Sequence, residues 1–174
     1  MNGPPTRRTL RLLRRAPEPA DAEALFAIQG DAEAMRHTYC APSLEATAAH
    51  LESYAARFAE DGFAPWTAVL SAEDRIVGWG GLNKDPSAPE WGTEVAYYID
   101  RAYWGCGLAT ELVCESLTLA FGDLGLDLVG AFAKPENAAS VRVLVKAGFE
   151  RARFVPELAR EEFRVTAESR LRAR

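Results

Sequence analysis

The fold of this chain is decided by the segment Glu94-Val-Ala-Tyr-Tyr-Ile-Asp-Arg-Ala-Tyr-Trp-Gly-Cys-Gly-Leu-Ala-Thr-Glu-Leu-Val113. Its first residues are β-branched or aromatic, which predicts a strand over residues 94–99. Apolar residues then recur at helical spacing, which predicts a helix over residues 108–121. Gly105 and Gly107 predict a tight turn between the two, because glycine adopts positive φ and lets the backbone approach another group closely.

A glycine turn at the start of a helix is suited to binding an anion. The first amides of a helix have no acceptor within the helix, and the helix dipole adds partial positive charge at the same end. The backbone amides of residues 105–110 are therefore expected to bind a phosphate. A plain strand-to-helix connection with no ligand is the alternative that this segment alone leaves open.

The composition is that of one globular domain. The chain has 174 residues, of which 48% are hydrophobic, and its formal net charge is −5. Scattered basic residues in an acidic chain argue against a nucleic-acid surface. No apolar run has the length of a membrane span, so a cytoplasmic protein is expected.

The N-terminal arginines allow two interpretations. A strand over residues 9–13 with exposed arginines is favoured, because no apolar signal core follows and Pro17 comes early. A transit peptide is the alternative.

The three cysteines, Cys40, Cys106 and Cys114, fit neither a zinc site nor a disulfide framework, and no metal site is expected. Cys106 lies near a helix N-terminus, a position at which a thiol can become reactive. We nevertheless interpret Cys106 as a tolerated residue between two required glycines.

The rest of the chain alternates between helical and strand patterns. Helices are expected over residues 19–36, where Gly30-Asp31 interrupts the apolar stripe, and over residues 43–60 and 138–146. Strands are expected over residues 66–70, 76–82, 128–132, 149–155 and 163–165, and a loop over residues 85–89. This mixed order predicts the α/β (α+β) class, with one central sheet.

A second motif follows the strand expected at residues 128–132. Pro135-Glu-Asn-Ala-Ala-Ser140 turns the chain into a helix with Asn137 at its N-cap, and Lys146-Ala-Gly-Phe149 ends that helix at a glycine. Together with the turn Trp104-Gly-Cys-Gly-Leu-Ala109, these segments resemble the signature motifs of the GNAT superfamily of N-acetyltransferases. The chain is most similar to the branch of ribosomal-protein N-terminal (RimJ/RimL-like) acetyltransferases. The first position of the turn is usually Arg or Gln in the family and is Trp104 here.

The resemblance implies a single acetyltransferase domain over residues 1–174, with a core at about residues 9–166 and short polar termini. It implies a mixed sheet of about six or seven strands, splayed between the fourth and fifth and flanked by about four helices. The implied reaction moves the acetyl group of acetyl-CoA to a primary amine of a small molecule or a protein N-terminus, without a metal. Neither nucleic acid nor a membrane is expected as a partner, and a homodimer stays open.

The resemblance also implies a binding site for coenzyme A. In the family, residues that match Tyr97, Tyr98 and Ile99 pair their backbone with the pantetheine arm, which lies in the gap between the splayed strands. Asn137 matches a residue that hydrogen-bonds the same arm. The pyrophosphate is expected at the turn, on Gly105, Cys106, Gly107, Leu108, Ala109 and Thr110.

The catalytic residues are less well marked. Where better-known N-terminal acetyltransferases have Glu and Tyr, this chain has Phe132 and Leu144, and neither transfers a proton. Ser140 matches the residue with which the RimL-like branch protonates the departing thiolate, and a hydrogen bond within the helix is the alternative. Glu94 is the first candidate for the base and Glu157 the second, with a solvated surface carboxylate as the alternative.

The large aromatic residues allow two interpretations. We interpret Trp66, Trp79, Trp91 and Tyr39 as core or rim residues, with a wall of the acceptor pocket as the alternative.

A non-catalytic acyl-CoA sensor is a competing function. It would fit the absence of the Glu and Tyr that other N-terminal acetyltransferases have.

A dinucleotide-binding protein would share the Gly105-x-Gly107 turn. However, Thr110 occupies the third fingerprint position, and Asp127 precedes the next strand instead of ending it.

Overall fold

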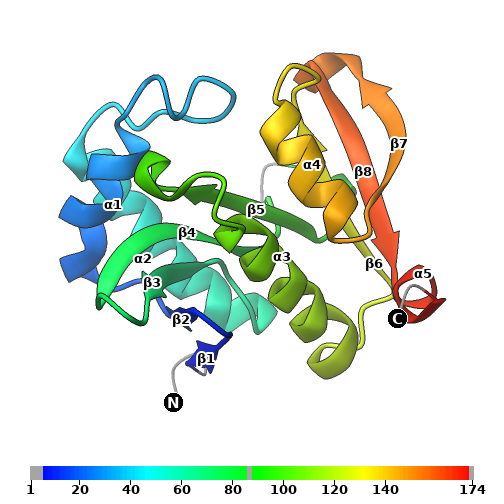
Figure 1. Ribbon diagram of the computed structural model, residues 1–174, viewed down its shortest axis with the longest axis horizontal. Helices are drawn as coiled ribbons and strands as arrows, with labels where there is room; N and C mark the ends of the chain where they lie inside the picture. The colour runs from blue at the N-terminus through cyan, green and yellow to red at the C-terminus, as the bar shows by residue number, and fades with distance from the viewer. Residues whose placement is uncertain (1–5, 86–87, 173–174) are drawn as a thin grey trace.

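In the part of the chain that the structure describes, eight strands form one mixed sheet in the order β1-β2-β3-β4-β5-β6-β8-β7 (Figure 1). The computed structural model describes residues 6–85 and 88–172. The strands are β1 (Arg7–Arg8), β2 (Leu12–Arg15), β3 (Trp66–Leu70), β4 (Arg75–Asn83), β5 (Glu94–Ile99), β6 (Leu128–Ala133), β7 (Glu150–Val155) and β8 (Arg160–Thr166). The helices are α1 (Ala22–Gln29), α2 (Leu44–Asp61), α3 (Leu108–Thr118), α4 (Ala138–Lys146) and α5 (Ala167–Arg172).

The sheet opens between β5 and β6, which is the expected splay. These parallel neighbours share one paired position, Glu94 opposite Gly130. By contrast, β4 and β5 pair along their length, and so do β6 and β8. The backbone groups of β5 and β6 beyond that one position lack a strand partner on the facing side, so they are available to a ligand.

Helices cover both faces of the sheet. Core residues on α3 and α4, such as Val113 and Leu144, pack against one face, whereas Leu25 on α1 and Leu51 on α2 pack against Trp79 on the other. Most expected elements lie within two residues of their predicted ends. Of the loop predicted at residues 85–89, residues 86 and 87 lie outside the described part of the chain.

The N-terminal segment forms a hairpin and not the single strand predicted at residues 9–13. β1 pairs with β2, and Thr9 N–H donates to the Leu12 carbonyl across the turn at 2.8 Å. This hairpin adds one strand to the sheet, so the splay falls between the fifth and sixth strands. The prediction of exposed arginines is wrong for Arg14, whose side chain is fully buried.

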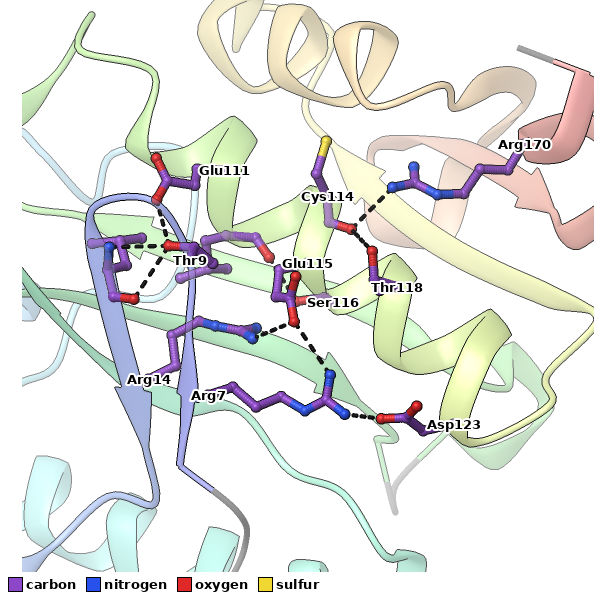
Figure 2. A network of polar contacts seen from close by, with 12 residues as sticks. Arg7, Thr9, Arg14, Glu111, Cys114, Glu115, Ser116, Thr118, Asp123 and Arg170 are labelled. Carbon is purple, nitrogen blue, oxygen red and sulfur yellow. Dashed lines mark hydrogen bonds and ion pairs between the residues drawn. The ribbon is translucent and has the colours of Figure 1, made fainter. Parts of the chain in front are cut away.

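Arg14 is buried because α3 supplies its counter-ion. Its guanidinium lies 3.0 Å from the Glu115 carboxylate and 4.5 Å above the Trp66 ring. Figure 2 shows Arg7 and Arg14 pointing toward the same carboxylate from the hairpin. Burial lowers the pKa of Arg14 to about 10, so the group is still charged at neutral pH. The ion pairs fasten the hairpin to the helix that follows the glycine turn.

Helix α1 is shorter than the helix predicted over residues 19–36. It ends at Gln29, and the Asp31 carboxylate then accepts the amides of Glu33 and Ala34 at 3.0 and 3.1 Å. An Asp that caps amides in this way favours turns over helix. An ion pair between Glu33 and Arg101, at 2.6 Å, ties the α1–α2 loop to the segment after β5.

The buried carboxylate of Asp21 forms hydrogen bonds with residues of β2 and β3, in the N-terminal half of the sheet. Both nitrogens of Arg15 donate to its carboxylate at 2.7 and 2.6 Å, Thr67 Oγ1 donates at 2.8 Å and Glu18 N–H at 2.9 Å. Desolvation would raise the pKa of Asp21, but these hydrogen bonds together outweigh it and lower the pKa. The ionised carboxylate therefore stabilises the fold.

We predict that Asp21→Ala lowers the free energy of unfolding at pH 7 by about 3 kcal/mol, since a buried charge network loses its acceptor. A folded-state pKa below the ordinary value contributes stability above about pH 4, and this contribution disappears as the pH falls through the lowered pKa. Urea denaturation of the wild type and of Asp21→Ala at several pH values measures the effect. A stability difference that does not shrink in acid would contradict the prediction.

Within residues 6–85 and 88–172, no helix combines the length and the apolar character that a membrane crossing requires.

Candidate active site

A cavity of about 470 Å³ lies where the sheet opens, bounded by β5, the glycine turn, the first turns of α4 and the α1–α2 loop. Most of the residues predicted for the site meet there. Those that line the cavity are Glu94, Tyr97, Tyr98, Ile99, Gly105, Gly107, Leu108, Ala109, Thr110, Asn137 and Ser140.

The glycine turn leaves open space in front of its backbone. Gly105 and Gly107 have φ values of +78° and +82°, which disfavour any residue with a Cβ. A Cβ on Gly105 would have no heavy atom within 4 Å, and one on Gly107 would meet Arg11 Nη2 at 3.5 Å. The first bond of α3 runs from Glu111 N–H to the Gly107 carbonyl at 3.1 Å. The amides before Glu111 have no acceptor within the helix, so they can bind an anion such as a phosphate.

Arg11 supports this turn, and no local sequence pattern indicated this role because Arg11 precedes the turn by 95 residues. Its Nη1 donates to the Cys106 carbonyl at 2.7 Å, and its Nε donates to Glu111 at 2.8 Å. Desolvation would raise the pKa of Glu111, but hydrogen bonds from Thr9 and Arg11 outweigh it and lower the pKa. Arg11 therefore offsets a carboxylate that would otherwise repel an anion at the turn.

Cys106 was predicted for the site but is not among the residues that line the cavity, and its carbonyl accepts the hydrogen bond from Arg11. The thiol is exposed and faces the Trp104 carbonyl, with the sulfur 3.7 Å from that oxygen.

On α4, a serine and a tyrosine form a pair at the cavity. Asn137 caps the helix by accepting Ser140 N–H at 3.1 Å. Ser140 Oγ lies 2.9 Å from the Tyr97 hydroxyl, and either oxygen can donate. Burial raises the pKa of Tyr97 to about 12, so the phenol holds its proton at neutral pH. The sequence pointed to the backbone of Tyr97 but not to this role of its side chain.

Glu94 lies at the point where β5 and β6 meet. Asn83 Nδ2 donates to its carboxylate at 3.1 Å, and Arg57 in turn donates to Asn83 Oδ1 at 3.0 Å. Desolvation, together with the charge of Asp85, raises the pKa of Glu94 against the opposing effects of Asn83 and Arg160. A carboxylate with a raised pKa is a better proton acceptor than a solvated surface glutamate.

Glu94 and Ser140 approach the cavity from opposite faces of the sheet. Val95 and Tyr97 pack with the α3–α4 core, so the alternation of the strand places Glu94 and Tyr98 on the α1–α2 face. The Tyr97–Ser140 pair is on the α3–α4 face. The gap between β5 and β6 connects the two.

Other candidates lie elsewhere. Glu157 is exposed in the β7–β8 connection, outside the cavity lining. Trp66 and Trp79 are core residues, as predicted, and Trp91 lines a separate cavity. Tyr39 packs edge-on against His50. The acceptor-pocket alternative is therefore not supported for these four aromatic residues.

At the two positions where other N-terminal acetyltransferases have acid–base residues, Leu144 is buried and Phe132 lines the cavity. Among the described residues, no three His, Cys, Asp or Glu side chains come close enough together to hold a metal ion.

Known proteins are similar to this chain in sequence and in fold. A model of the acetyltransferase (GNAT) domain matches residues 11–150. The N-acetyltransferase YoaA of Bacillus subtilis is 28% identical over 149 residues, which cover 84% of this chain and 84% of YoaA.

Two solved structures illustrate the shared fold. An acetyltransferase from Agrobacterium tumefaciens superposes with a TM-score of 0.80 at 22% identity, over 92% of this chain and 94% of that one. RimJ of Mycobacterium smegmatis, solved with CoA-disulfide, superposes with a TM-score of 0.74 at 17% identity, over 93% and 88%. The chain therefore belongs to the GNAT family of acetyltransferases and is an N-acetyltransferase.

Proposed function

We propose that the chain catalyses direct transfer of the acetyl group from acetyl-CoA to a primary amine, with Glu94 as general base and Ser140 as the proton donor to sulfur. The observation that carries the proposal is that one cavity brings together a glycine turn at a helix N-terminus, a gap between strands, a carboxylate of raised pKa and a hydroxyl pair.

The glycine turn is assigned to the pyrophosphate of coenzyme A. The amides of residues 107–110 and the dipole of α3 would hold it, and Arg11 would keep the turn in place. The free backbone edges of β5 and β6 would bind the pantetheine arm, and Asn137 would contact it from the α4 side. RimJ, solved with CoA-disulfide, shares the fold, which supports this assignment.

The thioester supplies an activated acyl carbon and a leaving group. The amine nitrogen forms a bond to this carbon, the carbon–sulfur bond breaks, and the nitrogen gives up one proton. Glu94 accepts that proton, directly or through a water molecule, because its raised pKa favours protonation. Most of the rate comes from holding the two reactants together.

Ser140 is assigned to the departing sulfur. Its hydroxyl gives a proton to the thiolate and takes one from the Tyr97 hydroxyl, which lies 2.9 Å away. Burial keeps the Tyr97 phenol protonated at neutral pH, so the relay begins with a proton in place. Water that enters the cavity returns a proton to Tyr97 after the transfer, and Glu94 releases its proton to water.

Incubation with acetyl-CoA and a panel of primary amines, followed by measurement of free thiol and of the acetylated amine, tests the proposal. Thiol release well above the rate without enzyme, with one acetylated amine per thiol, is the expected result. A protein that binds acetyl-CoA but releases thiol only at the background rate would be an acyl-CoA sensor, the alternative that Phe132 and Leu144 favour.

Ser140→Ala is expected to lower kcat by about 10²-fold, the usual value of one proton-transfer group, and to leave the Kd for acetyl-CoA within about twofold. Tyr97→Phe keeps the ring and removes the relay, so its kcat should fall less than that of Ser140→Ala. Ser53→Ala is a matched control. Ser53 is also a serine on a helix, but it donates to the His50 carbonyl on α2 and does not line the cavity. A Ser140→Ala enzyme with wild-type kcat would remove Ser140 from the mechanism.

A further inference from the structure

The cavity carries a charge opposite to that of the chain as a whole. The protein has a formal net charge of −5, yet Glu94 is the one carboxylate among the described residues of the cavity wall. The basic side chains of the wall are Arg36, Lys134, Arg142, Lys146 and Arg160. None of these side chains forms an ion pair with a described residue. The charge of the cavity wall therefore favours ligands that carry negative charge.

Three of these five basic residues lie in two different parts of the cavity. Arg142 and Lys146 lie on α4, beside the Asn137 and Ser140 end that is assigned to coenzyme A. The phosphates of the cofactor account for cations there. Arg160 begins β8, on the other side of β6, so it needs a different explanation.

Sheet register places Arg160 and Glu94 on the same face, with β6 between them. Ala131 and Ala133 pack into the α3–α4 core, so Phe132 points to the α1–α2 face, as Glu94 does. Glu162 is paired with Phe132 and shares its face, and Arg160, two residues earlier on β8, shares it as well. A base and a guanidinium thus face the same space across the Phe132 ring.

The two charges interact without touching. Arg160 acts to lower the pKa of Glu94, although the two side chains form no ion pair with each other. An unpaired acid and an unpaired guanidinium on either side of a cavity match a molecule with an amine at one end and an anion at the other. A guanidinium is also the side chain best shaped to bind a carboxylate through two hydrogen bonds.

We propose that the acceptor is an α-amino acid, whose amine lies at Glu94 and whose carboxylate binds Arg160. The inference rests on the proposed acetyl transfer and selects between the two acceptor classes that the sequence left open. The N-terminus of a protein carries an amide where an amino acid carries its carboxylate, so it would leave Arg160 without a partner. Binding without that partner would carry the desolvation cost of the guanidinium.

The test pairs each of the twenty standard amino acids with its α-carboxamide, at saturating acetyl-CoA, together with short peptides that begin with serine or alanine. At least one free amino acid should exceed its amide in kcat/KM by about 10-fold to 100-fold, since one charge-assisted bond contributes about 1.5–3 kcal/mol. Arg160→Gln should reduce this ratio to about one, mainly through a higher KM for the acid. Arg160→Lys should keep part of the preference.

Arg151→Gln is the matched control. Arg151 is on the neighbouring strand β7, pairs with Glu161 at 2.7 Å and lies outside the cavity lining, so the ratio should not change. Equal use of acids and amides, better use of the peptides, or an Arg160→Gln variant that slows acids and amides alike would overturn the inference. Absence of turnover with every free amino acid would overturn it too. Acetylation of an amide or a peptide in the same panel would show that the proposed acetyl transfer itself still holds.

Discussion

Glu94→Gln is expected to lower kcat by about 10²-fold to 10³-fold, because glutamine keeps the shape and the hydrogen bond from Asn83 but cannot accept a proton. Glu157→Gln is the matched control, since Glu157 is exposed and outside the cavity. Its kcat should equal that of the wild type. A Glu94→Gln enzyme with wild-type kcat would exclude Glu94 as the base.

The pH dependence gives a second test of the same residue. A general base works as the carboxylate, and burial raises the pKa of Glu94 above the ordinary value of about 4.3. The kcat of the wild type, measured with saturating acceptor, should therefore rise with pH through that raised value. Asn83→Leu removes a hydrogen bond that stabilises the carboxylate, so the rise should move to higher pH. Glu94→Gln should abolish the rise.

Measurements of stability distinguish a catalytic role of Glu94 from a structural role. A carboxyl group with a raised folded-state pKa contributes most below its unfolded-state pKa, and this contribution is lost as the pH rises through the folded-state value. Glu94→Gln should therefore be at least as stable as the wild type at pH 7, as measured by urea denaturation. A marked loss of stability would mean that the ionised carboxylate supports the fold.

Local sequence signals predicted the parts of the site that lie on one continuous segment. Gly105 and Gly107 adopt the positive φ that the turn requires, and Asn137 is the N-cap that its residue type favours. The apolar spacing from Leu108 matches the face of α3 that is buried. These features depend on residues a few positions apart, and pattern reasoning is reliable at that range.

The features that the sequence did not reveal come from distant segments. Arg14 reads as an exposed strand residue, and its burial depends on Glu115 and Trp66, which approach it only in the folded sheet. Arg11 reaches the Cys106 carbonyl in the same way. Helix α1 ends at the Gly30-Asp31 interruption that the sequence indicated. The predicted return to helix up to residue 36 was wrong, because helix propensity at Ala32 to Met35 yields to the local hydrogen bonds of Asp31. No spacing in the sequence encodes such contacts.

Gly107→Trp is expected to weaken coenzyme A binding by more than about 100-fold, as measured by calorimetry. The indole would occupy the space in front of the turn, where a Cβ already lies 3.5 Å from Arg11 Nη2. Loss of even two charge-assisted hydrogen bonds to the pyrophosphate, at about 1.5–3 kcal/mol each, accounts for a change of this size.

Backbone strain alone would not explain that loss, and Gly62→Trp shows why. Gly62 has a φ of +77°, close to the +82° of Gly107, and nothing lies within 4 Å of a Cβ there. Tryptophan at either position carries a similar left-handed strain of about 1–2 kcal/mol, and Gly62 ends α2, outside the cavity lining. Both variants should therefore lose similar stability, whereas coenzyme A affinity should fall in Gly107→Trp alone. Equal affinity in the two variants would mean that the phosphates bind somewhere other than the turn.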